Sequence, residues 1–131
     1  MVKDSIADML VRIKNAQAVK KESTIVPYSQ LLWEVARILE EKEFIAKIDR
    51  RGKRFRRSIE IGLLYDDQGR ARISGVRRIS KQSRRVYQKA ANLHPTKHGY
   101  GIQVLTTSKG IMASDDARKA RVGGEVLFEI W

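Results

Sequence analysis

Cysteine is absent from the 131 residues of this sequence. Its absence excludes disulfides, thiolate metal ligands and cysteine nucleophiles, and it fits a reducing compartment. Long apolar segments are also absent: no apolar run exceeds three residues, so we expect neither a membrane span nor a signal peptide. The sequence therefore predicts a soluble cytoplasmic protein without a membrane partner, long enough to bury a core of its own.

Acidic residues are scarce. The chain has 27 Lys and Arg against 15 Asp and Glu, a formal net charge of +12. Residues 68–114 contain no Asp or Glu, and their ten basic residues are Arg70, Arg72, Arg77, Arg78, Lys81, Arg84, Arg85, Lys89, Lys97 and Lys109. A surface that is only solvated usually mixes both signs, because like charges repel. The stretch therefore predicts an anionic partner, and its excess of arginine suits contacts to phosphate and to bases.

The amino-terminal half alternates between helical and strand patterns. Apolar residues at helical spacing predict helices over residues 4–19 and 29–43, with Asp4 and Ser29 as the capping residues. Strands are expected over residues 23–27, 44–50 and 58–64, which gives the order α-β-α-β-β.

A second basic run separates the last two of these strands. Six of the eight residues at positions 50–57 are Lys or Arg, and Gly52-Lys53 predicts a hairpin there. The strongest turn signal of the chain follows at Asp66-Asp67-Gln68-Gly69. We therefore expect one domain over residues 1–68 and another over residues 69–131.

The second domain is predicted to be mostly β. Short strands are expected over residues 71–74 or longer, 84–87, 101–107 and 125–130. A short helix that Ser114 caps and Gly123-Gly124 ends is expected before the last strand. The fold class is therefore α+β, with two small domains packed together.

Residues that suggest catalysis or a metal have simpler explanations. His94 and His98 lie in a predicted loop with no carboxylate or thiol nearby, and Lys97 would repel a cation. The pairs Asp66-Asp67 and Asp115-Asp116 suit a turn and a helix start, and adjacent carboxylates do not converge on one ion. We expect no enzyme activity, no metal, no cofactor and no small-molecule substrate.

A small polar segment, Thr106-Thr107-Ser108-Lys109-Gly110, follows a predicted strand. Its hydroxyls suit base edges or ribose hydroxyls of an irregular RNA, with Lys109 on a phosphate and Gly110 allowing close approach. An ordinary strand end with a tight turn explains the same residues equally well. Gly123-Gly124-Glu125 either stops a helix or offers a carboxylate to a base amino group. Tyr87 is either a core residue or a stacking platform on a basic face.

Several motifs, in matched order along the whole chain, resemble the bacterial small ribosomal subunit protein eight family. They are Asp4-Ser5-Ile6-Ala7-Asp8-Met9-Leu10, Arg12-Ile13-Lys14-Asn15-Ala16, Arg78-Ile79-Ser80-Lys81, Arg85-Val86-Tyr87, Thr107-Ser108-Lys109-Gly110-Ile111-Met112, Ala117-Arg118-Lys119 and Gly123-Gly124-Glu125-Val126-Leu127. The chain departs from the family at Ser29-Gln30-Leu31-Leu32, where the usual Ser-Lys-Leu-Lys carries two more positive charges, and at Glu43, where the second helix commonly ends on Gly.

The resemblance implies direct binding to the central domain of small-subunit (16S) ribosomal RNA, a role in its assembly, and contacts with neighbouring small-subunit proteins. Several members also repress their own operon by binding a similar messenger RNA fold. By position, it implies RNA contacts from Thr107, Ser108, Lys109, Gly110, Gly124, Glu125, Tyr87, Lys14 and Lys20. The polar segment and the basic stretch add Thr106, Lys81, Arg84 and Arg85 as candidate RNA-binding residues. The alternative is a general RNA-binding or annealing protein outside the ribosome. Such a protein usually has a disordered basic tail or repeated basic patches, and this sequence shows neither.

Overall fold

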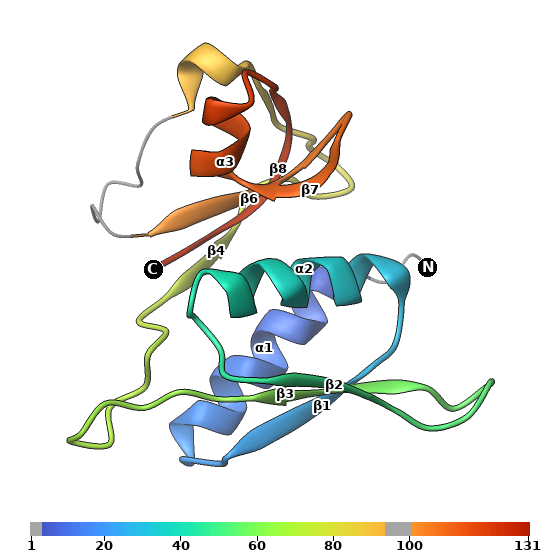
Figure 1. Cartoon of the computed structure of the whole chain (residues 1–131), viewed down its shortest axis with the longest axis vertical. Coiled ribbons are helices and arrows are strands. Elements are labelled where there is room, and N and C mark those ends of the chain that lie inside the picture. The colour runs from blue at the N-terminus through green and yellow to red at the C-terminus, as the bar shows by residue number, and fades with distance from the viewer. Residues whose placement is uncertain (1–3, 94–100) are drawn as a thin grey trace. The chain divides into compact units, whose positions relative to one another are not determined.

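The computed structural model describes residues 4–93 and 101–131. The chain forms two compact units, and the division falls between Ile73 and Ser74. Unit 1 ends at Ile73 and unit 2 begins at Ser74, and each combines helical segments with an antiparallel sheet (Figure 1). The predicted α+β class is confirmed.

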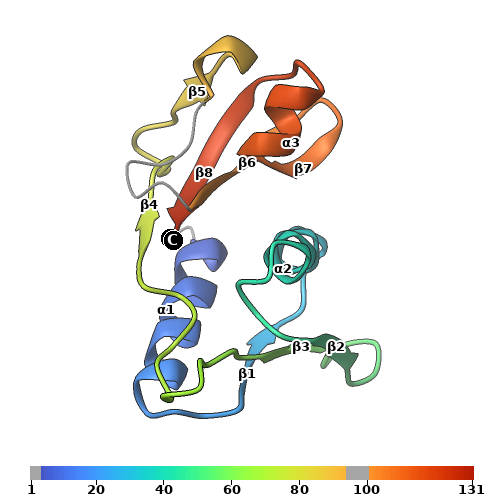
Figure 2. The same cartoon turned by 60° about the vertical axis from the view of Figure 1, so that its left-hand side comes forward.

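Unit 1 has the predicted order α-β-α-β-β. Its elements are α1 (Ser5–Ala18), β1 (Ser23–Pro27), α2 (Gln30–Glu41), β2 (Ile48–Arg51) and β3 (Ser58–Gly62). The strands form an antiparallel sheet in the order β1-β3-β2, and both helices lie on one face of it (Figures 1 and 2). Apolar residues of the helices and of β3 fill the space between these layers, among them Met9, Ile13, Val35, Leu39, Ile59 and Ile61.

Both helices of unit 1 begin at the predicted capping residues. The Asp4 carboxylate accepts a hydrogen bond from the Ala7 backbone N–H at 3.1 Å. The Ser29 hydroxyl accepts one from the Leu32 backbone N–H, also at 3.1 Å. Each bond satisfies an N–H group that has no partner within its helix.

The predicted strand over residues 44–50 is wrong in its first half, because β2 begins only at Ile48. The Phe44 N–H donates to the Leu39 carbonyl at 2.9 Å and so completes the end of α2. Phe44 and Ile45 are buried in the segment that follows the helix. Burial of two neighbouring residues does not fit a strand with one buried face, so the spacing of Phe44, Ala46 and Ile48 does not mark a strand before Ile48.

Residues 69–73, which the sequence places in the second domain, belong to unit 1. The predicted turn is present, because the Asp66 carboxylate accepts from the backbone N–H groups of Gln68 and Arg70, each at 2.9 Å. The chain then folds back, and the Arg72 N–H donates to the Leu64 carbonyl at 2.9 Å. These bonds hold the segment against the end of the first sheet.

Unit 2 is a five-stranded antiparallel sheet with two short helical segments. In chain order it contains β4 (Val76–Arg78), β5 (Tyr87–Gln88), the 3₁₀ helix η1 (Ala90–Asn92), β6 (Ile102–Thr107), β7 (Gly110–Ala113), α3 (Ser114–Lys119) and β8 (Gly124–Ile130). The strand order is β4-β8-β6-β7, and β5 also pairs with β8. Leu93, Leu105, Ala117 and Val126 form a buried cluster beneath α3 and η1.

Several predictions for the second half of the chain are wrong. The strand expected over residues 71–74 or longer begins only with β4 at Val76, the strand expected over residues 84–87 is reduced to β5, and β7 is not predicted by the sequence. Ser114 does not cap α3, which begins from Ala113. The Ser114 hydroxyl instead accepts from the Gln103 backbone N–H at 3.1 Å, so a contact to β6 takes the group that would cap the helix.

Candidate nucleic-acid interface

Strand register in unit 2 brings three distant segments together at one end of the sheet. Thr107 on β6 faces Gly124 on β8, and Thr106 faces Glu125. On the other side of β8, Tyr87 of β5 also faces Glu125. Most of the predicted site residues, which span about forty positions of sequence, therefore occupy one small area.

The turn between β6 and β7 presents two polar residues to solvent. Thr107 pairs with Gly110, so Ser108 and Lys109 form a two-residue connection. The Thr107 hydroxyl accepts from the Lys109 backbone N–H at 3.0 Å and donates to the Gly110 carbonyl at 2.8 Å. Gly110 has a φ of +105°, a conformation that favours glycine. The turn is thus fixed from within by Thr107.

The side chains of Ser108 and Lys109 are exposed. Within residues 4–93 and 101–131, neither forms a hydrogen bond or ion pair through its side chain. The two groups therefore differ from the Thr107 hydroxyl, which is used inside the turn. A hydroxyl and an ammonium group on a rigid turn can bind a base edge or ribose and a neighbouring phosphate.

Gly124 allows β8 to approach β6 closely. A Cβ atom at this position would lie 2.1 Å from the Thr106 carbonyl oxygen. Gly123 is equally confined, because its Cβ would lie 2.3 Å from the Gln88 carbonyl oxygen. The prediction that this glycine pair ends α3 is wrong, because the helix ends at Lys119 and the left-handed residue after it is Arg121, with a φ of +58°. The glycines instead let three strands meet beside the Ser108–Lys109 turn.

The structure changes the interpretation of Glu125. This residue is buried, with 8% of its surface exposed, and its carboxylate accepts from the Arg85 guanidinium at 2.9 Å. The carboxylate was expected to be a lone acceptor for a base amino group, but an arginine of the same unit already occupies it. Glu125 therefore holds Arg85 against the sheet. Tyr87, opposite Glu125, is 70% exposed, which excludes the core alternative and leaves its ring available for stacking.

Lys81 and Arg84 lie on a tight connection before β5. Their backbones form a reciprocal pair, with N–H to carbonyl distances of 2.7 and 2.9 Å. The buried Ser80 hydroxyl fixes this connection, because it accepts from the Val86 N–H at 2.8 Å and lies 3.2 Å from the Val86 carbonyl oxygen. The connection borders a hollow of about 400 Å³ whose polar lining includes Arg77, Arg78, Lys81, Arg84, Gln88 and Gln103.

Lys14 and Lys20 lie in unit 1 and form no part of the cluster built by β5, β6, β7 and β8. Lys14 is exposed on α1. Lys20 is exposed directly after the helix, with a φ of +58°.

Sequence reasoning missed two groups that shape the interface. It did not assign Ser80 a role, and it did not pair Arg85 with Glu125. Both interactions depend on how β5 meets β8, and a two-residue strand leaves no periodic pattern from which its register can be read.

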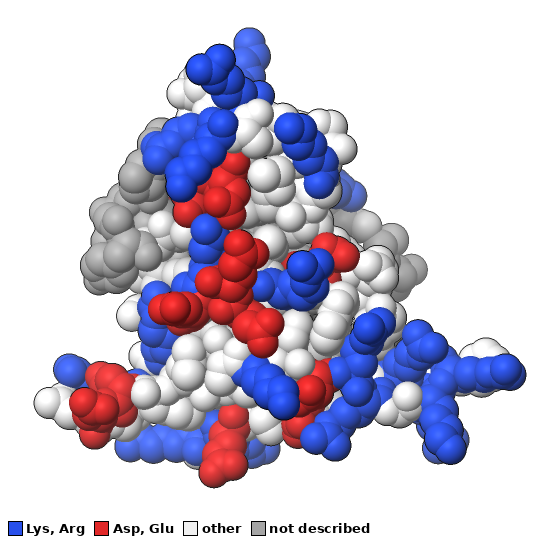
Figure 3. Space-filling model, in the orientation of Figure 1, with Lys and Arg blue, Asp and Glu red and all other residues white. Residues whose placement is uncertain are grey.

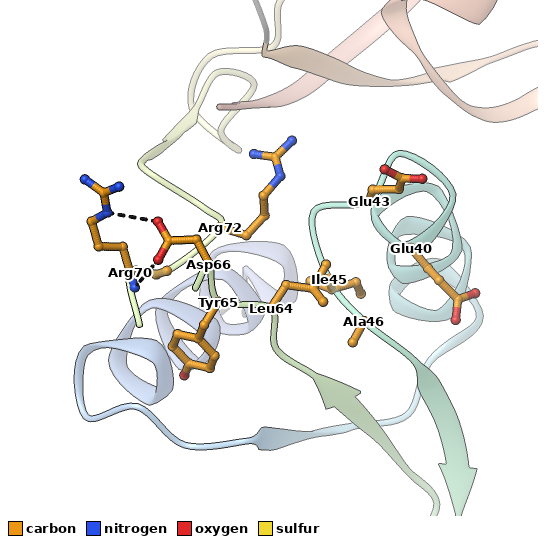
Figure 4. A pocket seen from close by; sticks show the side chains of 10 residues that line it. Glu40, Glu43, Ile45, Ala46, Leu64, Tyr65, Asp66, Arg70 and Arg72 are labelled. Atoms are coloured by element: carbon orange, nitrogen blue, oxygen red, sulfur yellow. Dashed lines mark hydrogen bonds and ion pairs between the residues drawn. The ribbon is translucent and has the colours of Figure 1, made fainter. Parts of the chain in front are cut away.

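Unit 1 contains a larger hollow of about 600 Å³ (Figure 4). Two of its carboxylates are engaged within the protein: Glu40 accepts from the Ile48 N–H at 3.3 Å, and Asp66 binds Arg70. Hydrogen bonds from the Arg70 backbone, and then from its side chain and from Gln68, lower the pKa of Asp66 below its usual value. Desolvation raises the pKa of the Tyr65 hydroxyl. These contacts give the residues structural roles.

Among the described residues, no group of three or more His, Cys, Asp or Glu side chains is arranged to hold a metal ion. His94 and His98 lie outside those residues. Within the same parts of the chain, no helix combines the length and apolar character that crossing a membrane requires.

Comparison with known proteins covers the chain from near its first residue to its last. Residues 4–131 match the family model for Ribosomal protein S8. The chain is 40% identical over 131 residues to the small ribosomal subunit protein uS8 of Helicobacter pylori strain Shi470, with all of both chains covered. It is 42% identical over 134 residues to the protein of the same name from Wolinella succinogenes, again with all of both chains covered. The resemblance inferred from the motifs is confirmed: this chain belongs to the ribosomal protein S8 family.

Proposed function

We propose that this protein binds small-subunit ribosomal RNA directly, in the central domain of the 16S molecule, and helps to assemble it. Membership of the S8 family indicates the coarser role, that of a structural component of the small ribosomal subunit and not of an enzyme. The observation that carries the finer proposal is the rigid turn at Ser108 and Lys109, which lies beside an exposed tyrosine and several cations at one end of the unit 2 sheet.

Charge and shape contribute separately to this proposed binding. Lys81, Arg84 and Lys109 attract phosphates and release counterions, which favours any RNA. The Ser108 hydroxyl is small enough to enter the minor groove of an irregular stem and bind an unpaired base or a ribose, and Tyr87 stacks at the border. Discrimination between RNAs therefore depends mainly on uncharged groups.

Glu125 and the glycines beside it act indirectly in this proposal. The carboxylate fixes the Arg85 guanidinium, and Gly124 fixes the distance between β6 and β8. We assign Thr106 and Thr107 the same positioning role, because the Thr107 hydroxyl is bound within the turn. Lys14 and Lys20 of unit 1 contribute phosphate contacts. The proposed location is the cytoplasmic ribosome, and the proposed further partners are neighbouring small-subunit proteins and the messenger RNA of the protein's own operon.

Crosslinking in cells followed by sequencing of the bound RNA tests this function. Recovery of one discrete stem of small-subunit ribosomal RNA is expected. Crosslinks spread over many unrelated RNAs would support the general annealing protein and contradict our proposal. In solution, engagement of about five to seven phosphates predicts that log affinity falls with log salt at a slope of roughly −4 to −6. A slope near zero would contradict the electrostatic part of the proposal.

A further inference from the structure

The loop that joins β2 to β3 is a strongly basic feature outside the proposed site. It comprises residues 52–57, all of them exposed, and continues the basic run that starts at Arg50. The β2–β3 hairpin extends from the unit 1 sheet in Figure 1, and Figure 3 shows Lys and Arg side chains gathered around this extension. We call residues 52–57 the hairpin loop.

A large aromatic side chain lies at the tip of the hairpin loop. Phe55 is 95% exposed, more than any other large hydrophobic residue in the described parts of the chain. It contributes nothing to the core, and full exposure of an apolar ring to water is unfavourable. A partner that covers the ring would remove this penalty.

Backbone geometry sets the position of Phe55. The Arg56 N–H donates to the Lys53 carbonyl at 2.8 Å, which closes a four-residue turn with Arg54 and Phe55 at its centre. Gly52 enters this turn with a φ of +90°, and a Cβ there would lie 2.1 Å from the Arg56 carbonyl oxygen. The turn is therefore tight, and its two central residues face outward.

The cations of the loop differ in how they are engaged. Arg51, just before the loop, is neutralised by Glu60 at 2.7 Å. The side chains of Lys53, Arg54 and Arg56 form no ion pair with any carboxylate of residues 4–93 or 101–131. Three uncompensated cations thus surround the exposed ring.

Aromatic rings also lie at the base of the hairpin. The Arg50 guanidinium lies 4.8 Å from the centre of the Trp33 ring, and the Arg57 guanidinium lies 5.9 Å from the centre of the Tyr28 ring. The two rings are 6.5 Å apart. Stacking on a ring orders an arginine without neutralising it, so both arginines keep their charge for a partner.

We propose that the hairpin loop is a second RNA-binding surface, which takes unpaired nucleotides by stacking a base on Phe55 and binding the adjacent phosphates with Lys53, Arg54 and Arg56. Alternating rings and charges match the alternation of bases and phosphates along a single strand. The carboxylates of an acidic peptide would form ion pairs with the cations, but they would offer no flat surface on which the Phe55 ring can stack. The surface belongs to unit 1 and needs none of the residues of the unit 2 site.

Fluorescence anisotropy with the full-length protein and labelled A12 and U12 RNA tests this inference. Phe55→Ala and Phe55→Leu are each expected to weaken binding roughly five- to tenfold. This loss of affinity lies at the lower end of the range expected when one base loses its stacking partner. Phe55→Trp retains the aromatic face and is expected to bind at least as well as the original. Joint replacement of Lys53, Arg54 and Arg56 by Ala is expected to flatten the salt slope by about two units. The matched control is Val19→Ala, which truncates a 67% exposed apolar residue elsewhere in unit 1.

Wild-type affinity in the Phe55→Ala and triple variants would overturn the inference. So would wild-type affinity of Phe55→Leu beside a weakened Phe55→Ala, because that pattern indicates a contact that any apolar side chain can make and not stacking on an aromatic face. Because Phe55 is fully exposed, unchanged circular dichroism and melting temperature are expected for its variants. A structured ribosomal stem, tested with Ser108→Ala in parallel, separates the two proposals. If stem binding depends on Ser108 while Phe55→Ala binds A12 and U12 with wild-type affinity, the proposed function stays intact and only this surface is refuted.

Discussion

Replacement of Gly124 by Ala is expected to disrupt the end of unit 2 that carries the proposed RNA site. The added Cβ would lie 2.1 Å from the Thr106 carbonyl oxygen, 2.9 Å from its carbon and 3.1 Å from the Thr107 Cα. All three atoms belong to the backbone, so no side-chain rotation relieves the overlap. The strands must separate by about 1 Å, since real Cβ contacts are essentially never shorter than 3.0 Å.

Separation of the strands has a predictable free-energy cost. It breaks about two hydrogen bonds at the end of the β6–β8 ladder, each contributing about 1 kcal/mol, and leaves residual strain. We therefore expect the free energy of unfolding of unit 2 to fall by about 2–4 kcal/mol. Affinity for the cognate stem is expected to fall as well, because the Ser108–Lys109 turn continues directly from the displaced strand.

Gly110→Ala is the matched control, since nothing lies within 4 Å of the Cβ position there and only the φ of +105° opposes the substitution. Its expected cost is about 1–2 kcal/mol. Urea titration followed by the fluorescence of Trp131, in a background where Trp33 is replaced by Phe, reports on unit 2 alone. If Gly124→Ala unfolds at the original urea concentration, or is as stable as Gly110→Ala, the close-approach argument is wrong.

Three further predictions concern single residues. Ser108→Ala is expected to weaken binding of the cognate RNA by about 1–2 kcal/mol and binding of a random duplex little. Lys109→Ala is expected to weaken binding of both RNAs and to flatten the salt slope by about one unit. Filter binding over a salt series checks both expectations, and equal losses of affinity for Ser108→Ala on the two RNAs would mean that Ser108 only positions its neighbours. Because the pKa of Asp66 is lowered in the folded state, its bonds to Arg70 stabilise unit 1 at pH above the ordinary carboxyl pKa, and this stabilisation is lost as the pH falls through the folded-state pKa. Asp66→Asn should therefore reduce the acid sensitivity of unit 1 in melting experiments at different pH. An unchanged dependence of melting temperature on pH would refute this. Glu43→Gly is expected to raise the free energy of unfolding by about 0.5–1 kcal/mol in thermal melts, because Glu43 has a φ of +63° at the end of α2; a loss of stability would contradict this.

Local chemistry accounts for the parts of the fold that the sequence predicted correctly. The Asp4 and Ser29 caps each bond to a backbone N–H three residues ahead, so both partners lie within one short segment. The order of elements in unit 1 follows from apolar periodicity over 12 and 14 helical residues, which is long enough to be distinctive.

Contacts between distant segments account for the errors. Ser114 has the right chemistry for a cap, but its hydroxyl is taken by Gln103, which lies eleven positions earlier. The four residues of β7 start with glycine and run directly into α3, so neither their length nor their composition indicates a strand. Phe44 belongs to an apolar pattern that is typical of a strand, yet it lies buried in the connection that follows α2. In each case, tertiary structure overrides a local preference.

The same distinction explains which features of the candidate site could be predicted from the sequence. Hydroxyls, lysine and glycine in Thr106-Thr107-Ser108-Lys109-Gly110 indicate a polar turn from composition alone, and the turn forms. The function of Glu125 depends on Arg85, 40 positions away, and the sequence showed only a carboxylate amid positive charge. Because Glu125 is only 8% exposed and one of its carboxylate oxygens already accepts from Arg85, little of the carboxylate is accessible to a base amino group. Under the proposed function, the groups left to distinguish one RNA from another are thus the Ser108 hydroxyl and the Tyr87 ring, and the positive charge around them would favour every RNA alike.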